Sequence, residues 1–266
     1  MVAKGLLAHC LLRHSVTPLL RYPSTLNLTK IKMETTYCTQ YPELMKYVNL
    51  CDYSLADIVL IAIGTILWLV AYGVIIRNSL KYKFVEMPVV AASANIAWEF
   101  AWGFLLVTNL GKAFIWGLQA WFLFDVFIFI QVLRYGHKQW KSGFFTKHFR
   151  LLVILATLVW VPVFYYMCKD GHDQPMGTTS AYFITVPMAV LYLSSFIDGP
   201  NARYYSLTVA WTKGLGNLFM TVFTWWHYHQ LSEIKIMALA VFAFDLIYFI
   251  KVWQYRRREN PAIAAG

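Results

Sequence analysis

The stretch MPVVAASANIAWEFAWGFLLV, residues 87–107, is long and apolar enough to cross a bilayer, yet it carries a carboxylate, Glu99, near its middle. About 20 consecutive apolar residues suffice for a transmembrane helix. A charged side chain at the centre of the bilayer costs about 3 kcal/mol on insertion scales, so such residues usually mark a functional site. The stretch therefore predicts a membrane fold and places a candidate site inside it.

The rest of the chain has the same character. Hydrophobic residues make up 59% and charged residues only 14% of the 266 residues, which is typical of a polytopic protein embedded in a lipid bilayer. The net charge of +10 could suggest a nucleic-acid partner, but the basic residues cluster at the ends of apolar runs, where they report membrane topology. We therefore expect no nucleic-acid binding.

Apolar windows of about 20 residues predict an all-α membrane protein, a seven-transmembrane-helix bundle. Short connections join the windows, so the helices are expected to form one compact domain. The predicted helices are Leu55–Ile76, Met87–Val107, Ala113–Leu133, Phe149–Met167, Ala181–Ile197, Tyr205–Trp226 and Ile234–Trp253.

Basic residues predict the orientation of the bundle. They gather after the first, third and last predicted helices, and the other connections carry few of them. The positive-inside rule then places the C-terminus in the cytoplasm. We expect an integral, multi-pass membrane protein, of the endoplasmic reticulum if the cell is eukaryotic. The residues are Arg77, Lys81, Lys83, Arg134, Lys138, Lys141, Lys147, Arg150, Arg256, Arg257 and Arg258.

The two ends of the chain are expected to lie outside the fold. Residues 1–45 form an N-terminal leader or tail, residues 46–258 the membrane domain and residues 259–266 a C-terminal tail. The first 32 residues are basic and contain no acidic residue, as in a transit peptide. The alternative is that translation starts at Met33.

Motifs for a metal or a cofactor are absent from the sequence. There is no Asp-Asp-x-x-Asp run, P-loop, Gly-x-Gly-x-x-Gly or His-Glu-x-x-His motif. We therefore expect no cofactor and no metal site. The spacing of the four cysteines likewise indicates neither a metal site nor a disulfide framework; they are Cys10, Cys38, Cys51 and Cys168.

Glu99 is predicted to share one face of its helix with an amide and two indoles. A spacing of three or four residues places side chains on the same side of a helix. The residues on this face are Asn95, Trp98, Glu99 and Trp102. Desolvation favours the neutral acid, and a protonated carboxyl beside indoles is suited to general acid catalysis. Alternatively, Glu99 and Asn95 hydrogen-bond to neighbouring helices as packing contacts.

Three further ionisable residues lie well inside predicted helices, namely Asp125, Lys213 and Asp245. At 1.5 Å per residue, Glu99, Asp125 and Asp245 all fall near mid-depth, so they could meet in one central cavity. Asp245 is either a second carboxyl that faces this cavity or the ion-pair partner of Lys213. Asp125 is either a third cavity group or that same partner.

Aromatic residues make up 18% of the chain. Some of them are expected in the belts at the two membrane surfaces. Others lie inside predicted helices near the polar groups, and these are Trp98, Trp102, Trp121, Trp211 and Tyr248. Because aromatic faces stabilise cations, an acid among indoles suits chemistry that passes through carbocations.

This combination resembles the small integral-membrane terpene cyclases, which include the fungal pyripyropene-type meroterpenoid cyclases and the paxilline-type indole-diterpene cyclases. The resemblance covers about Ser54 to Arg258 and rests on the seven short-looped helices, the Asn95-x-x-Trp98-Glu99 stretch and Asp245 in the last helix. It implies that Glu99 and Asp245 are the catalytic acidic pair. It also implies metal-independent cyclisation, started by protonation of an epoxide or alkene on a prenyl chain.

We therefore expect a membrane-bound terpene cyclase of the isomerase or lyase type, acting in terpenoid secondary metabolism on a lipophilic prenylated, meroterpenoid-like substrate. Such a substrate suggests functional coupling to a prenyltransferase and an epoxidase. The alternative is a seven-helix proton-coupled transporter that uses the buried carboxyls as a relay. Glu99 and Asp245 are the candidate catalytic residues, and the candidate substrate-binding residues are Asn95, Trp98, Trp102, Trp121, Asp125 and Tyr248.

Overall fold

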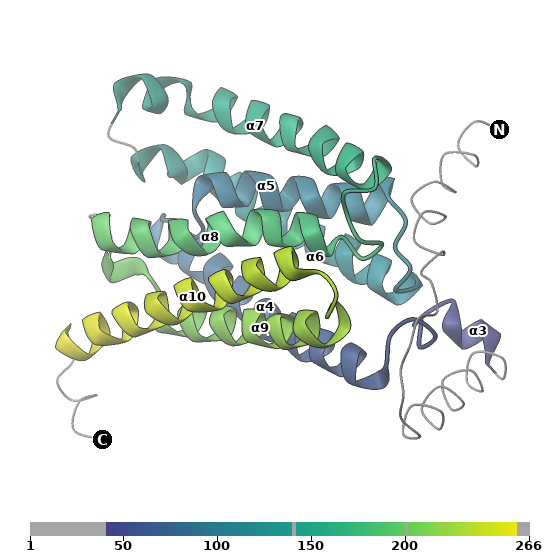
Figure 1. Ribbon diagram of the computed structural model, residues 1–266. Helices are drawn as coiled ribbons and strands as arrows, with labels where there is room; N and C mark the ends of the chain where they lie inside the picture. Colours follow the sequence, from purple (N-terminus) through teal and green to yellow (C-terminus); the bar gives the residue numbers. More distant parts are fainter. Residues whose placement is uncertain (1–40, 140–141, 200–201, 260–266) are drawn as a thin grey trace.

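The computed structural model describes residues 41–139, 142–199 and 202–259, and within these ranges every regular element is a helix. The predicted all-α fold is therefore confirmed. A short helix, α3 (Pro42–Met45), precedes a bundle of long helices (Figure 1). The bundle consists of α4 (Leu55–Tyr82), α5 (Val89–Phe100) with its π-helical continuation η1 (Ala101–Leu105), α6 (Lys112–Tyr135), α7 (Gly143–Lys169), α8 (Thr178–Asp198), α9 (Leu207–His227) and α10 (Ser232–Glu259). Two short 3-10 helices, η2 (Gly136–Gln139) and η3 (Ala202–Tyr204), lie in the connections.

Each predicted helix coincides with one helix of the bundle, but several run further than predicted. Helix α4 continues to Tyr82, where Lys83 adopts a left-handed conformation (φ 54°) and ends it. Helix α10 continues to Glu259. Hydropathy windows find only the apolar part of a helix, whereas the backbone stays helical through the polar residues that follow.

Among the described residues, five helices are long and apolar enough to cross a membrane, namely α4, α6, α7, α8 and α10. These helices support an integral membrane protein. Helix α5 with η1, Val89–Leu105, is apolar but shorter. Helix α9 is not among the five, and its buried face carries polar side chains, including Lys213 and Asn217.

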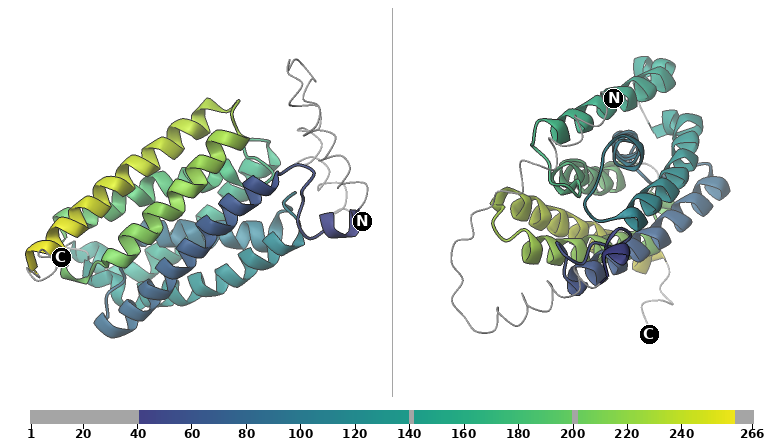
Figure 2. Two further views of the ribbon diagram at one scale, coloured as in Figure 1. Left: turned by 90° about the horizontal axis from the view of Figure 1, so that it is seen from below. Right: turned by 90° about the vertical axis from the view of Figure 1, so that its right-hand side faces the viewer.

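Helix α5 packs against α6, α7 and α8, while α4 packs along α9, and α10 packs along both α8 and α9 (Figure 2). Small side chains on α5 allow this close packing, as is common between membrane helices. These buried residues are Ala91, Ala92, Ser93, Ala94 and Ala97. The helix that carries Glu99 is thus enclosed by protein on several sides.

We call the end of the bundle beside α3 the α3 end. Helices α4, α6, α8 and α10 begin at this end, and α5, α7 and α9 run toward it (Figure 1). Backbone hydrogen bonds from Asn49 N to Leu110 O (3.0 Å) and from Lys112 N to Lys46 O (2.9 Å) tie the segment after α3 to the start of α6. The basic connections that predict the cytoplasmic side lie at the opposite end.

Two glycines bring α4 and α9 into close contact. A Cβ atom on Gly216 would lie 2.8 Å from Trp68 Cδ1 and 3.1 Å from Gly64 O, so no larger residue fits there without a shift. Small residues at helix crossings allow backbones to approach in this way. The close approach places Trp68 of α4 beside Asn217 of α9, next to the site described below.

The bonding of the cysteines differs from the prediction that they form no disulfides. Each of Cys51 and Cys168 takes part in a disulfide, and no cysteine within the described ranges is free. The spacing of cysteines along a chain does not show which of them meet after folding, so sequence reasoning missed this. Both residues lie at the α3 end. The predicted leader falls almost entirely in residues 1–40, outside the described ranges.

Candidate active site

A cavity of about 300 Å³ lies inside the bundle, between α4, α5, α6, α8 and α9. Its wall is mostly apolar and aromatic with a few polar groups, as in sites for small lipophilic molecules. The aromatic residues of the wall are Trp68, Tyr72, Trp98, Phe114, Trp121, Tyr182 and Phe223. The polar ones are Thr65, Asn95, Glu99, Thr178, Thr185, Asn217 and Thr224.

The side-chain amide of Asn95 joins three helices at this cavity. Its Nδ2 atom lies 2.7 Å from Tyr72 Oη on α4, 3.0 Å from Glu99 Oε1 on α5 and 2.6 Å from Asp125 Oδ2 on α6. An amide nitrogen carries two hydrogens, so three acceptors share two donors. A phenol and two carboxyl groups thus converge on one amide.

Glu99 Oε1 and Asp125 Oδ2 both accept from this one nitrogen, so the two carboxyl groups lie close together. Both Glu99 and Asp125 are buried, with 4% and 3% of their surface exposed. Two negative charges this close would repel each other. The pair therefore holds at least one proton.

One oxygen of these two carboxyl groups is left without a hydrogen-bond partner. Glu99 Oε2 is buried and has no hydrogen-bond partner among the described residues. An unpaired buried polar atom is costly, so sites of this kind are usually completed by a ligand or by water. Because Glu99 forms part of the cavity wall, the carboxyl pair can present its proton to a molecule inside the cavity.

Trp98, the neighbour of Glu99, is held by the connection between α7 and α8. Its Nε1 donates to Ser180 Oγ at 2.8 Å, and Ser180 Oγ donates in turn to Asp173. Asp173 also accepts backbone hydrogen bonds from Gln174, Thr179 and Ser180 at the start of α8. Burial raises the pKa of Asp173 to about 6, and these bonds oppose that shift. The indole of Trp98 is therefore fixed beside the acid.

A second buried polar cluster lies behind the cavity wall, on α9 and α10. Asn217, a wall residue, accepts a hydrogen bond from Trp68 Nε1 (2.9 Å) and donates to Asp245 Oδ2 (2.6 Å). Asp245 Oδ1 pairs with Lys213, and the two side chains are 1% and 0% exposed. Lys213 Nζ also lies 4.9 Å from the ring centre of Tyr192. Asp245 thus touches the cavity wall only through Asn217.

The helix that carries Glu99 changes from α to π immediately after Phe100. Its π segment, η1, is braced by Gln119, whose Nε2 donates to Gly103 O at 3.0 Å. A π turn contains more residues than an α turn and therefore rotates the residues that follow it; such segments often occur near functional sites. Trp102 accordingly packs against Gly177, where a Cβ atom would lie 2.5 Å from its Cε2.

The structure brings several predicted site residues together. Asp125 accepts from the same Asn95 amide as Glu99, whereas Asp245 pairs with Lys213, so the second carboxyl close to Glu99 is Asp125. The predicted residues that line the cavity are Asn95, Trp98, Glu99 and Trp121.

Besides Asp125, three predicted residues are absent from the cavity wall. Asp245 is paired with Lys213, as one of the two sequence interpretations had it. Trp102 is fully buried, with its ring centre 6.3 Å from that of Trp98. Tyr248 is fully buried and donates to Glu86 Oε1 at 2.9 Å, a carboxyl that sequence reasoning overlooked because it precedes the second helix. Direct roles in the reaction for these three residues stay predictions.

Sequence reasoning also missed several wall residues, although helical spacing carries a signal for them. On α4 a single face contains Thr65, Trp68 and Tyr72. On α9 a polar stripe at intervals of three or four residues contains Asn217, Thr221 and Thr224. A polar stripe on a membrane helix indicates a face turned toward protein or a cavity.

Comparison with known proteins identifies the family to which this architecture corresponds. A family model described as Pyr4-like transmembrane terpene cyclases matches residues 38–258. No solved structure matches the chain significantly.

Curated relatives agree with this match. The Pyr4-family terpene cyclase mfmH of Annulohypoxylon moriforme is 23% identical over 190 residues, covering 70% of this chain and 78% of the relative. Terpene cyclase olcD of Penicillium canescens is 24% identical, covering 77% of this chain and 88% of its own. Terpene cyclase spyD of Aspergillus fumigatus is 25% identical, and the match covers 77% of this chain and 90% of the relative.

The buried ion pair gives a stability prediction. Replacing one partner, by Lys213→Gln or Asp245→Asn, leaves the other charge buried without its counter-ion and is expected to cost about 3–5 kcal/mol. The double variant removes both charges and should recover much of that loss. Thermal unfolding of the detergent-solubilised protein measures the effect.

The matched control is the exposed pair of Lys46 and Glu43, 2.5 Å apart, where Lys46→Gln should change the melting temperature little. A double variant that is as unstable as the two single losses combined would contradict the ion-pair account.

Proposed function

Because this chain belongs to the Pyr4-like transmembrane terpene cyclases, we propose that Glu99 is the acid that starts cyclisation of a prenylated substrate in the cavity. The observation that carries this proposal is the position of Glu99 in the cavity wall, with its buried Oε2 atom unpaired and a second carboxyl, Asp125, bound to the same Asn95 amide. The family and the curated relatives make the chain a membrane-bound terpene cyclase, and they give no support to the transporter alternative.

The proposed reaction begins with transfer of the Glu99 proton to an epoxide oxygen or to an alkene carbon. The resulting positive charge on carbon is attacked by the next double bond of the chain, and ring closure continues until a neighbouring C–H bond gives up its proton to form an alkene. Protonation needs no diphosphate leaving group, so the proposed mechanism is metal-independent. One proton enters and one leaves, and the substrate is isomerised.

The surroundings of Glu99 suit this reaction. Asn95 and Asp125 hold the carboxyl in place, as an effective general acid requires. Aromatic rings that face the cavity stabilise the travelling positive charge. Some of these rings lie next to the polar groups, either along the sequence or in space. They belong to Trp68, Tyr72, Trp98 and Trp121.

For Asp245 we propose a positioning role. Together with Lys213 it holds the amide of Asn217, which in turn accepts from the indole of Trp68 on the cavity wall. This arrangement connects Asp245 to the reaction without placing it beside the substrate. The Lys213 ammonium keeps the buried carboxylate neutralised.

We further propose that all seven long helices cross the membrane, with the C-terminus in the cytoplasm. Helices α5 and α9 contact neighbours that cover their shorter or more polar surfaces. The positive-inside rule favours this orientation. The disulfides of Cys51 and Cys168 at the α3 end support it independently, because disulfides persist on the oxidising side of a membrane. In a eukaryotic cell this fits the endoplasmic reticulum.

The proposed substrate also implies which enzymes must act before the cyclase. A prenyltransferase must attach the prenyl chain before cyclisation, and an epoxidase must act first where the acid opens an epoxide. Both enzymes handle the same lipophilic molecule, so functional coupling in one membrane is part of this proposal.

Glu99→Gln tests the acid directly. The amide keeps the size of the side chain but has no acidic proton, so cyclisation should fall by at least about 100-fold while binding is retained. Product formation from an epoxyprenyl substrate in microsomes measures the first quantity, and quenching of tryptophan fluorescence measures the second.

Glu86→Gln is the matched control. Glu86 is 2% exposed and lies outside the cavity wall, and burial raises its pKa to about 8, so it is largely neutral at pH 7 and an amide replaces it closely. Full activity in Glu99→Gln, or an equal loss in Glu86→Gln, would refute the assignment.

The orientation gives a separate prediction. A glycosylation acceptor sequence inserted at Gly171, in the connection between α7 and α8, should be glycosylated in microsomes, whereas a C-terminal tag should be digested by added protease. The reverse pattern would overturn the orientation without affecting the proposed chemistry.

A further inference from the structure

The connection between α7 and α8, residues 170–177, covers part of the cavity. Met176 in this connection and Thr178 at the start of α8 both belong to the cavity wall. Gly177, which lies between them, adopts a left-handed backbone conformation (φ 76°) and packs on Trp102. The connection therefore lies beside the part of α5 and η1 that carries Glu99.

A single buried carboxyl organises the start of α8. Asp173 is 1% exposed. Its Oδ1 atom accepts hydrogen bonds from the backbone nitrogens of Gln174, Thr179 and Ser180 at 2.8, 2.9 and 3.2 Å. The first amides of a helix need such acceptors, and the N-cap residue here, Gly177, has no side chain to supply one. Asp173 therefore caps α8 from outside the helix.

The other oxygen of Asp173 determines the direction of the Ser180 hydroxyl. Ser180 Oγ donates to Asp173 Oδ2 and accepts from Trp98 Nε1 at 2.8 Å; Gly177 O, at 3.2 Å, is a second acceptor for its hydrogen. A hydroxyl has one hydrogen, so a hydrogen that points to Asp173 leaves the lone pairs of Oγ free for the indole N–H. Ser180 is 0% exposed, which shields this bond from water.

The hydrogen bond to Ser180 fixes an indole that lines the cavity next to the acid. Trp98 directly precedes Glu99 on α5, and both side chains belong to the cavity wall. An indole held by its N–H keeps one orientation, whereas a free indole can adopt several rotamers. The attraction between a cation and a ring depends on the distance and on the position over the ring face. The orientation of Trp98 therefore determines where in the cavity a positive charge is stabilised.

We infer that Asp173 and Ser180 are positioning residues that determine how far cyclisation proceeds. Through Trp98 they fix the place where the growing carbocation is stabilised. Without that stabilisation, the cation loses a neighbouring proton earlier and gives an alkene isomer with fewer rings. Neither residue belongs to the cavity wall, so both act through the indole. The inference rests on the proposed function and adds to it a control of product specificity from outside the cavity.

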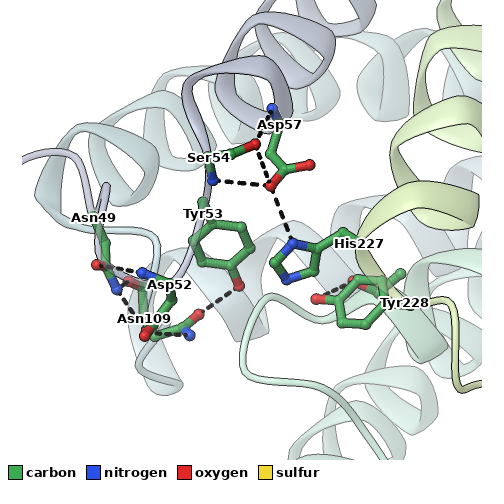
Figure 3. Close-up of polar contacts among 9 residues, drawn as sticks. Asn49, Asp52, Tyr53, Ser54, Asp57, Asn109, His227 and Tyr228 are labelled. Carbon is green, nitrogen blue, oxygen red and sulfur yellow. Dashed lines mark hydrogen bonds and ion pairs between the residues drawn. The ribbon is translucent and has the colours of Figure 1, made fainter. Parts of the chain in front are cut away.

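Contacts on its other side hold the connection in place. Thr178 Oγ1 donates to Tyr228 Oη at 3.2 Å, and the ring of Tyr228 meets that of His227 edge-on (Figure 3). His227 Nδ1 lies 3.2 Å from a carboxyl oxygen of Asp57 on α4 (Figure 3). The connection is thus joined to α9 and α4 as well. A change at Ser180 should therefore release the indole without releasing the whole connection.

Ser180→Ala removes the acceptor of the indole N–H. The substrate should still be consumed, because Glu99 keeps its hydrogen-bond partners. The share of products with fewer rings should rise at least about tenfold, because a free indole stabilises the later cations less well. Gas chromatography with mass spectrometry measures the product ratio, with an epoxyfarnesyl resorcinol as substrate in microsomes. Trp98→Phe, which has no N–H, should shift the ratio in the same direction.

The double variant distinguishes positioning from a general structural role. If Ser180 acts through the indole, Ser180→Ala should change the product ratio little in a protein that already carries Trp98→Phe, because the effects of coupled residues do not add. An equal shift in both backgrounds would overturn the inference. Where Ser180→Ala does not fold, Trp98→Phe removes the same bond from the other side, and an unchanged product ratio there would overturn it as well.

Asp173→Asn tests the carboxyl. The amide keeps an oxygen for the three backbone bonds but places a donor beside Ser180 Oγ, where it competes with the indole N–H. The serine hydrogen then turns to Gly177 O. Products with fewer rings should increase, but less than in Ser180→Ala; an unchanged ratio would remove Asp173 from the positioning role.

Ser93→Ala is the matched control. Ser93 lies on α5, the helix of Trp98, and is 2% exposed, but its hydroxyl donates to Val90 O at 2.9 Å within the same helix. The same substitution there should leave the product ratio unchanged. A shift as large as that of Ser180→Ala would show that any lost buried hydroxyl has this effect, and would reject the inference.

Glu99→Gln separates the inference from the proposed function. Loss of all cyclised products in Glu99→Gln, with an unchanged ratio in Ser180→Ala, would leave the acid standing and reject the positioning role. Normal turnover in Glu99→Gln, with a shifted ratio in Ser180→Ala, would do the reverse. A lack of turnover in the unaltered protein would reject both.

Discussion

The amide of Asn95 and its three acceptors determine how the active site is built. The hydrogen bonds join α4, α5 and α6 through Tyr72, Glu99 and Asp125, and they satisfy polar atoms that hydrocarbon would leave without partners. Two buried carboxyl groups that share one amide donor repel each other if both are charged, so the arrangement favours a proton on one of them. Membrane enclosure then keeps that acid away from bulk solvent and beside lipophilic molecules.

In the second buried cluster, the charged side chains are kept out of the cavity. Lys213 and Asp245 neutralise each other behind the wall, and only the uncharged amide of Asn217 and the indole of Trp68 reach the cavity. A carbocation inside the cavity thus meets aromatic faces and not a free carboxylate on this side. Aromatic faces stabilise a cation without forming a bond to it.

Much of this organisation could be predicted from the sequence, because membrane constraints leave few solutions. The apolar windows locate the helices, and the cost of burying Glu99 marks the site. Helical spacing correctly places Asn95 and Trp98 with Glu99. It also places Trp102 beside Trp98, but Trp102 is fully buried and outside the cavity wall, and the π-helix that begins two residues after Glu99 was not predicted.

The pairing of the buried charges depends on tertiary structure and could not be derived from depth alone. Asp125 and Asp245 both fall near mid-membrane, but only the packing of α6 against α5 and of α10 against α9 shows that Asp125 meets Glu99 and Asp245 meets Lys213. The hydroxyls of Tyr182 and Thr224 likewise come from different helices.

The most direct test of the account is an experimental structure with a prenylated ligand whose epoxide is replaced by an unreactive ether. The account predicts the ether oxygen within hydrogen-bonding distance of Glu99; an ether oxygen bound at Asp245 and Lys213 would contradict it.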